Sequence, residues 1–417
     1  MSFDGSLVIE RLRELPGGSE LLAVAREHGG MELVGGAVRD ILLGLVPREL
    51  DTLVERDVQT VVDALVERLN GEATVHERFG TALISSPVAQ IDLVRARAES
   101  YSAPGALPDV RPGTLEQDLA RRDFTVNAIA VALDGANAGQ TRAAPRALED
   151  LERRRLRVLH ERSFIDDPTR LLRLARYAAR LDFEIEQHTA ELAAQALAID
   201  ALSTVSRARI GAELRLALAE AEPLAAVEEM SRLGLLKALD PELSIDGSLV
   251  RRAMRLVPAD DGRPDLLVLA SLMLDLVGHT GSDRGGPAYA LLSDWQFSAQ
   301  DRERVLGAAL TSRRLAAELS CALPASRLHT LASRAPLEGV ALAGALGGSD
   351  CERAAKRWLE ETRKVALAIT GEDLLAAGVP QGPEIGLRLN AALAMRLDGE
   401  VDDMHERQLQ AALEAQV

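Results

Sequence analysis

Leu33 to Asp51 reads LVGGAVRDILLGLVPRELD, and this stretch decides the fold of the first part of the chain. A short apolar strand runs into a Gly35-Gly36 turn, a short helix follows, and a second strand begins near Glu49. Glycines let a backbone approach phosphates closely, and alternate side chains of a strand point the same way. Glu49 and Asp51 therefore share one face, where carboxylates can hold a divalent metal against a nucleoside triphosphate. A structural turn beside an acidic pair is the alternative.

Around this stretch, the first 135 residues mix short strands and helices. Residues 57–69 are predicted to form an amphipathic helix, because valine and leucine recur there at helical spacing. The segments ATVHERFG, TALISSP and QIDLVRARAE are predicted to be strands. From about Ala144 onward the pattern is almost wholly helical, with Gly or Pro breaks. The sequence thus predicts an α+β fold, in which a small mixed sheet backed by helices precedes a long helical region.

Composition sets outer limits on the kind of protein. A chain of 417 residues should divide into two to four units. No apolar run is long enough to span a membrane and the N-terminus lacks a secretory pattern, so we expect a cytoplasmic protein. Cys321 and Cys351 have neither metal spacing nor a disulfide framework.

The net charge of −16 has the wrong sign for a protein that grips an RNA backbone, but arginines cluster locally. The clusters are at residues 121–122, 153–157, 170–180 and 207–209. Pairing of these arginines with neighbouring acids is the alternative to RNA binding.

Four further motifs follow the opening stretch. They are QIDLVRAR (Gln90 to Arg97), RRDFTVNAIA (Arg121 to Ala130), FIDDPTRLLRLARYAARL (Phe164 to Leu181) and VSRARIGAEL (Val205 to Leu214). In this order and at these separations, the first 240 or so residues resemble the class II tRNA nucleotidyltransferase and poly(A) polymerase family, which includes the bacterial CCA-adding enzymes. The resemblance implies a DNA polymerase β-like nucleotidyltransferase head with a mixed sheet, followed by an all-α neck, body and tail. We expect the head at residues 1–140, the neck at 141–245, and the body and tail at 246–417.

The resemblance also implies a two-metal phosphoryl-transfer site made by Glu49, Asp51 and Asp92, with Mg²⁺ as the ion and Mn²⁺ as the alternative. Glu49 and Asp51 are the expected metal ligands. The family has Asp where this chain has Glu49, and one extra methylene could lower activity, shift it toward Mn²⁺ or abolish it. An acid on a solvated strand face is the alternative for Asp92.

Gly35, Gly36 and Arg39 are expected to face the triphosphate, because turn N–H groups and a guanidinium suit an anion. The alternative is that Arg39 and Asp40 form a local ion pair that fixes the turn.

In RRDFTVNAIA, alternation predicts that Phe124 and Val126 are buried while Asp123, Thr125 and Asn127 face the other way. The resemblance implies that Asp123 and Asn127 recognise ribose and that Arg122 contacts phosphate. A turn or cap role is the alternative for Asp123.

Asp167, Arg170 and Arg173 stand three residues apart, which predicts that they share one helical face. The resemblance implies that Asp167 and Arg170 read the base and so choose between CTP and ATP, with Arg173 also at the nucleotide. The family has Glu where this chain has Asp166. The alternative is a helix start at Pro168, capped by Asp167, with the arginines pairing back to Asp166 and Asp167.

Taken together, the resemblance implies a template-independent enzyme that adds CMP and AMP from CTP and ATP to tRNA 3′ ends. A CC-only, A-only or poly(A)-adding relative shares every motif. Glu49, the altered segment after Asp134 and the acidic charge also leave open a degenerate RNA-binding paralogue. Long members carry a phosphohydrolase domain with His-Asp pairs; Leu274 precedes Asp275 here, so we expect no such activity. The sequence carries no signal for an oligomeric state.

Overall fold

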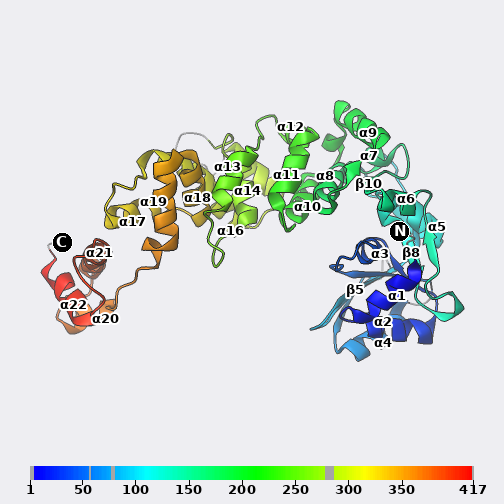
Figure 1. Cartoon of the computed structure of the whole chain (residues 1–417), viewed down its shortest axis with the longest axis horizontal. Helices are drawn as coiled ribbons and strands as arrows, with labels where there is room; N and C mark the ends of the chain where they lie inside the picture. Colours follow the sequence, from blue (N-terminus) through cyan, green and yellow to red (C-terminus); the bar gives the residue numbers. More distant parts are fainter. Residues whose placement is uncertain (1–3, 56–57, 77–79, 278–285, 416–417) are drawn as a thin grey trace. The chain divides into compact units, whose positions relative to one another are not determined.

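The computed structural model describes residues 4–55, 58–76, 80–277 and 286–415. The chain divides into two compact units, the first ending at Ser206 and the second beginning at Arg207. In Figure 1 the first unit is coloured from blue to green and holds the mixed sheet, whereas the second is helical. The α+β class predicted from the sequence is therefore confirmed. The division at 206/207 falls inside the expected neck, and the boundaries at 140/141 and 245/246 stay predictions.

Seven strands in the described part of the first unit form one sheet, in the order β3-β4-β5-β2-β1-β8-β9. Their bounds are β1 Met31–Val34, β2 Leu50–Val54, β3 Glu72–His76, β4 Thr81–Ser85, β5 Gln90–Arg95, β8 Ile129–Ala132 and β9 Thr141–Ala143. β2 runs parallel to β5, and the other neighbouring pairs are antiparallel. A separate ribbon pairs β6 (Arg97–Ser100) with β7 (Asp109–Pro112). The apolar strands β1 and β8 are buried along their whole length, which puts the core of the unit at the middle of the sheet.

Helices α1 (Gly5–Glu14), α2 (Gly18–His28), α3 (Gly36–Leu42) and α4 (Val58–Leu69) accompany the sheet. α4 packs against α2, β4 and β5, and it buries Val61, Val62, Leu65 and Leu69 at the predicted helical spacing. Asp57, with which the predicted helix began, and residues 77–79 of the predicted strand ATVHERFG lie outside the described residues.

The rest of the first unit is mainly helical but includes two short strands. Its elements are α5 Leu115–Ala120, η2 Thr125–Asn127, η3 Gly135–Asn137, α6 Ala147–Glu152, β10 Arg155–Leu156, α7 Ser163–Asp166, α8 Thr169–Leu181, β11 Glu184–Ile185, α9 Gln187–Ala198 and η4 Ala201–Thr204. β10 pairs in parallel with β11, and among the described residues after Ala144 this pair of strands is the one exception to the almost wholly helical pattern predicted there.

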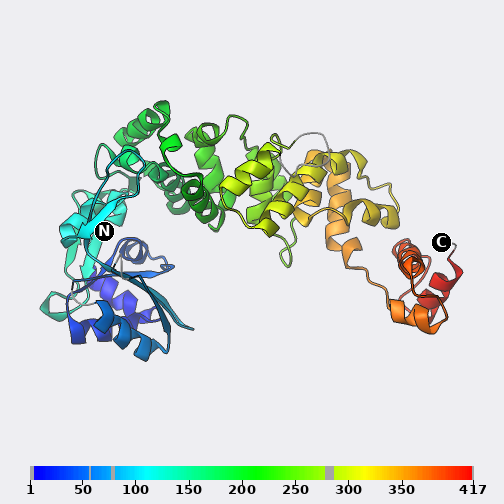
Figure 2. The same cartoon turned by 180° about the vertical axis from the view of Figure 1, so that it is seen from behind.

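The second unit is helical throughout its described residues. Its elements are α10 Arg207–Leu218, α11 Pro223–Arg232, α12 Leu235–Leu239, α13 Gly247–Met254, α14 Pro264–Leu272, α15 Pro287–Asp294, α16 Ala299–Glu318, α17 Ala325–Ala332, α18 Leu337–Leu346, α19 Gly348–Glu360, η5 Thr362–Lys364, α20 Gly371–Ala376, α21 Pro383–Leu397 and α22 His405–Glu414. α18 packs against α16 and α19, and Figure 2 shows these helices from behind. α20, α21 and α22 share a small apolar core around Leu374 and Ala392. None of the helices in the described ranges combines the length and the apolar character needed to cross a membrane.

Candidate active site

Three carboxylates meet on neighbouring strands of the sheet. Asp51 in β2 and Asp92 in β5 are direct partners in the parallel register, so their side chains leave the sheet on the same face. Glu49, which was predicted to lie on the strand with Asp51, is a bend residue just before β2, which begins at Leu50; its carboxylate nevertheless reaches those of Asp51 and Asp92. One oxygen of each carboxylate lies within 4.8 Å of the corresponding oxygens of the other two. The structure thus brings together the three acids that the sequence motifs single out.

The charge on this cluster is poorly balanced by the protein. Burial, together with the neighbouring Asp92 and Glu49, raises the pKa of Asp51 to about 6, although Arg122 and Arg39 act in the opposite direction. Carboxylate oxygens are the ligands that Mg²⁺ and Mn²⁺ accept, and a cation at this point would offset the repulsion. The donor set therefore fits a divalent ion, and Glu49 reaches it despite the extra methylene.

The glycine turn lies against Arg122. Gly35 has a φ of 69°, a conformation that strains any other residue, and a Cβ there would push against the Arg122 guanidinium. Arg122 donates to the Asp118 carboxylate at 3.0 Å and to the Asn127 carbonyl at 3.3 Å. The turn between β1 and α3 is thus closed on one side by the guanidinium expected to contact phosphate.

Arg39 is buried in an ion pair with Asp40. Its side chain is 1% exposed, and it donates through Nε and Nη2 to Asp40 Oδ1 at 2.8 and 2.6 Å and through Nη1 to Asn127 Oδ1. Burial lowers the pKa of the guanidinium, but Asp40 and Tyr177 outweigh this effect and the net shift is upward. The geometry supports the alternative of a local ion pair, and it does not support the predicted phosphate contact.

The motif RRDFTVNAIA is not an alternating strand in its first half. Thr125–Asn127 form the short helix η2, and Asp123, Thr125 and Asn127 are all buried together with their apolar neighbours. The predicted alternation is wrong here because Thr125 is tied to another segment: its N–H donates to the Arg157 carbonyl and its hydroxyl to Asp150. Only β8, from Ile129, continues as a strand.

Asp123, the one acid of this motif, is held by several hydrogen bonds and an ion pair. Its Oδ1 accepts from the Phe124 N–H at 2.8 Å and from Asn127 Nδ2 at 2.9 Å, and its Oδ2 lies 2.7 Å from Arg173 Nη2. Burial alone would raise the pKa of Asp123, but the ion pair with Arg173 and the Asn127 hydrogen bond hold it well below its ordinary value. Asp123 is therefore a carboxylate of fixed orientation next to the amide of Asn127.

Asp167 precedes the helix that carries the arginines. It ends α7 in an extended conformation, and its Oδ1 accepts from the Thr169 N–H at 3.1 Å and from the Thr169 hydroxyl at 2.7 Å. Because α8 begins at Thr169, the prediction that Asp167, Arg170 and Arg173 share one helical face is wrong for Asp167. Arg170 is buried and donates to Ser163 Oγ at 2.7 Å and to the Arg121 carbonyl at 2.6 Å.

Two residues of α8 join this region although the sequence analysis assigned them no role. Tyr177 packs under the guanidinium groups of Arg39, Arg173 and Arg176, and Arg180 Nη2 donates to Asp40 Oδ2 at 2.7 Å. The sequence did contain a signal for this contact. Arg173, Tyr177 and Arg180 are spaced four and three residues apart, which places all three on one face of a helix.

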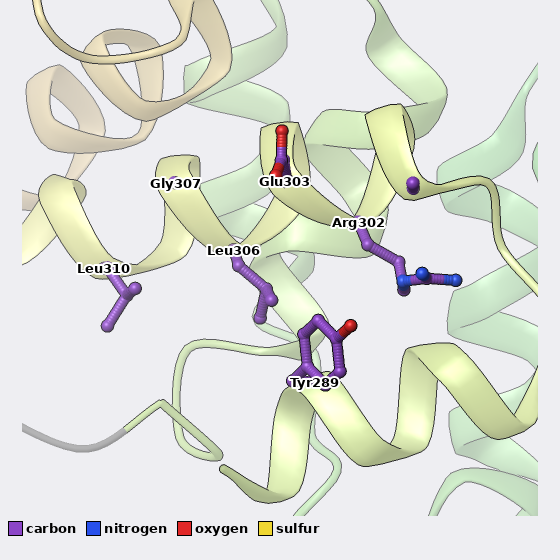
Figure 3. A pocket seen from close by; sticks show the side chains of 7 residues that line it. Tyr289, Arg302, Glu303, Leu306, Gly307 and Leu310 are labelled. Atoms are coloured by element: carbon purple, nitrogen blue, oxygen red, sulfur yellow. The ribbon is translucent and has the colours of Figure 1, made fainter. Parts of the chain in front are cut away.

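A pocket of about 490 Å³ lies between α15 and α16 in the second unit. Figure 3 shows the Tyr289 ring of α15 facing Leu306 and Arg302 of α16. The Arg302 guanidinium lies 5.5 Å from the centre of the Tyr289 ring, and Glu303 also lines the pocket. An aromatic ring beside a guanidinium suits a flat polar ligand such as a nucleobase.

Comparison with known proteins agrees with this geometry. Residues 31–157 match the model of the poly A polymerase head domain, and residues 182–246 match that of the probable RNA- and SrmB-binding site of polymerase A. The carboxylate cluster, Gly35, Asp123 and Asn127 all lie within the first match.

Relatives match over most of the chain. The A-adding tRNA nucleotidyltransferase of Halalkalibacterium halodurans is 32% identical over 84% of this chain and 81% of its own length. The CC-adding tRNA nucleotidyltransferase of Deinococcus radiodurans is 35% identical over 90% of this chain and 87% of its own. A solved structure of a Thermotoga maritima CCA-adding enzyme complexed with tRNA superimposes with a TM-score of 0.77 at 26% identity and covers 99% of both chains. The chain therefore belongs to the tRNA nucleotidyltransferase and poly(A) polymerase family.

Proposed function

We propose that this protein is an RNA nucleotidyltransferase that transfers CMP, AMP or both from CTP and ATP to the 3′ end of tRNA. The observation that carries the proposal is the cluster of Glu49, Asp51 and Asp92, whose oxygens lie within 4.8 Å of one another. The relatives that match over most of the chain are nucleotidyltransferases of the same substrate class. Because tRNA is the substrate, we place the protein in the cytoplasm.

Glu49 and Asp51 would hold the divalent ions, Mg²⁺ or alternatively Mn²⁺, with Asp92 as the third carboxylate. When bound, such ions activate the attacking 3′-hydroxyl and neutralise the triphosphate from which pyrophosphate leaves. The reach of Glu49 into the cluster favours the catalytic interpretation over that of a degenerate RNA-binding paralogue.

The other residues would position the nucleotide. Asp123 and Asn127 present an acceptor and an amide to the ribose hydroxyls, and Arg122 beside Gly35 presents a guanidinium to the phosphates. Asp167 and Arg170 would pair with the base edge, and Arg173 orients Asp123. Arg39 is buried and would serve as a positioning residue, because it donates to Asn127 and would not itself contact the nucleotide.

The helical unit would recognise the shape and the sugar-phosphate backbone of the tRNA acceptor stem and not its base sequence. Its pocket at Tyr289 and Arg302 offers a place for one unstacked base.

Incorporation of labelled CTP and ATP into tRNA transcripts that end before CCA, after CC, and after CCA tests the proposal. We expect stepwise growth that stops at a defined end. Growth only on the first transcript marks CC addition, growth only on the second marks A addition, and continued growth marks poly(A) synthesis. Absence of any incorporation with Mg²⁺ and with Mn²⁺, from protein that binds tRNA, would overturn the proposal.

A further inference from the structure

A closed network of charged contacts joins the base-reading helix to the two other nucleotide motifs. Arg180 of α8 donates to Asp40, which pairs with Arg39 on α3. Arg39 donates to Asn127 of η2, Asn127 donates to Asp123, and Asp123 pairs with Arg173, which lies on α8 again. We call Arg39, Asp40, Asp123, Asn127, Arg173 and Arg180 the α8 network. The network begins and ends on the same helix, two turns apart.

Tyr177 lies inside this network. It follows Arg173 by four residues and precedes Arg180 by three, and it is 9% exposed. The guanidinium carbons of Arg39, Arg173 and Arg176 lie 5.1, 5.5 and 4.8 Å from the centre of its ring. Arg173 Nη2 also donates to the Tyr177 hydroxyl at 3.3 Å. One ring is thus shared by three guanidinium groups from two helices.

This arrangement needs the ring. Three like charges packed together in a buried place repel one another, and two carboxylates, Asp40 and Asp123, meet part of that charge. The negative face of an aromatic ring supplies a further attraction that an aliphatic side chain lacks. Phe124 fixes the ring from the side, edge to face, with the ring centres 5.9 Å apart.

We propose that Tyr177 is a positioning residue for nucleotide selection. Its ring sets Arg173, which orients Asp123 toward the ribose, and it sets Arg39, which orients Asn127. Arg170, one turn before Arg173 on α8, is held by the same helix, so ribose and base recognition share one anchor. The inference rests on the proposed function, in which CTP and ATP are the nucleotides. Tyr177 touches neither the nucleotide nor the carboxylate cluster in this role.

The test compares Tyr177→Phe with Tyr177→Leu in the full-length protein. The readouts are the Kd of CTP and ATP by calorimetry with Mg²⁺, the ratio of kcat/KM for the two nucleotides, the Kd of tRNA, and the Tm. We expect Tyr177→Leu to raise the Kd of CTP and of ATP by about tenfold. The kcat/KM values for the two nucleotides should also become more alike, by a similar factor. Phenylalanine keeps the ring and should stay within about threefold of wild type, with tRNA affinity unchanged in both variants.

Arg180→Met provides an independent variant, because its side chain is 19% exposed and contacts the network through Asp40. It breaks the network at Asp40 and should shift nucleotide selection in the same direction as Tyr177→Leu. Arg68→Met, which removes an exposed arginine that pairs with Glu27 and lies outside the arginine clusters in the sequence, is the matched control and should behave as wild type.

Two results would overturn the inference. The first is wild-type nucleotide affinity and selectivity in both Tyr177→Leu and Arg180→Met. The second is an equal loss of nucleotide affinity in Tyr177→Phe and Tyr177→Leu that is fully accounted for by a lower Tm. The proposed function fails in a different way. If the wild-type protein binds CTP and ATP but incorporates neither, that function falls, while the binding comparison still decides the role of Tyr177.

Discussion

Arg173 Nη2 lies 2.7 Å from Asp123 Oδ2, so a residue of the base-reading helix holds the carboxylate proposed to read the ribose. Asp123 is 7% exposed, and its ionised form depends on this partner and on Asn127. One ion pair inside the first unit therefore links Asp123, proposed to read the ribose, to α8, proposed to carry base-reading Arg170.

Removal of the arginine side of this pair should destabilise the protein. Arg173→Met leaves a buried carboxylate without its cation, and we expect the free energy of unfolding to fall by about 2–3 kcal/mol in urea titrations. Arg173→Lys keeps the charge and should cost less. A loss below about 0.5 kcal/mol in Arg173→Met would show that the pair does not stabilise the fold.

Asp51 should make the metal-free protein less stable as the pH rises. Its pKa is about 6 in the folded protein, above the ordinary value of 3.8, so ionisation of Asp51 opposes folding. The contribution of Asp51 to the free energy of unfolding is therefore greatest below about pH 4, and it is lost as the pH rises through about 6.

The Asp51→Asn variant should lack this part of the pH dependence, and at pH 7 without divalent ions it should be more stable than wild type by about 1–3 kcal/mol. Urea unfolding in EDTA at pH 5 and 7.5 measures the difference, with Asp109→Asn on the exposed strand β7 as control. Identical pH dependence in wild type and Asp51→Asn would contradict the assignment.

Glu49 should be required for turnover although it replaces the family's aspartate. Glu49→Gln removes a charged ligand, and we expect kcat with Mg²⁺ to fall by about a hundredfold or more. Glu49→Asp should stay active or gain activity. Glu72→Gln, an exposed strand residue, is the control. Unchanged turnover in Glu49→Gln would remove Glu49 from the metal site.

Asp167 should determine the choice between nucleotides. Asp167→Ala removes an acceptor at the base edge, and we expect the CTP to ATP ratio of kcat/KM to change by about tenfold. Asp166→Ala, which removes the neighbouring acid paired with Arg162, serves as the matched control. A ratio that is the same in both variants and in wild type would refute the base-reading role.

The pocket of the helical unit should contribute to tRNA affinity and not to nucleotide affinity. Tyr289→Leu and Arg302→Met remove the ring and the guanidinium, and we expect the Kd of tRNA to rise by about tenfold in filter binding. The KM for CTP should stay the same. Arg353→Met, on the exposed face of α19, is the control. Wild-type tRNA affinity in both pocket variants would exclude this contact.

The carboxylate cluster could be predicted from the sequence, because the family resemblance singles out Asp92 and because Asp51 and Asp92 are partners on neighbouring strands. Glu49 joins the cluster from the bend before β2, not from the strand that was predicted to carry it. The sequence did not predict the surroundings of Arg39, whose burial depends on Asn127, 88 residues away, and on Tyr177 of α8. Alternation failed at Thr125 for the same reason, since hydrogen bonds to Arg157 and Asp150 override the local pattern. Asp167 does not share the helical face of Arg170 and Arg173, because α8 begins only at Thr169 and Asp167 is an extended residue before it, whose carboxylate accepts from the Thr169 N–H.

Single-turnover incorporation of labelled CTP and ATP into tRNA transcripts ending before CCA and after CC, by wild type and by Asp51→Ala with Mg²⁺, tests the central claim most directly. We expect wild type to extend at least one transcript, and Asp51→Ala to extend neither while it keeps its tRNA affinity and has a Tm no lower than that of wild type. Extension by Asp51→Ala at the wild-type rate would contradict the claim that Glu49, Asp51 and Asp92 form the catalytic centre.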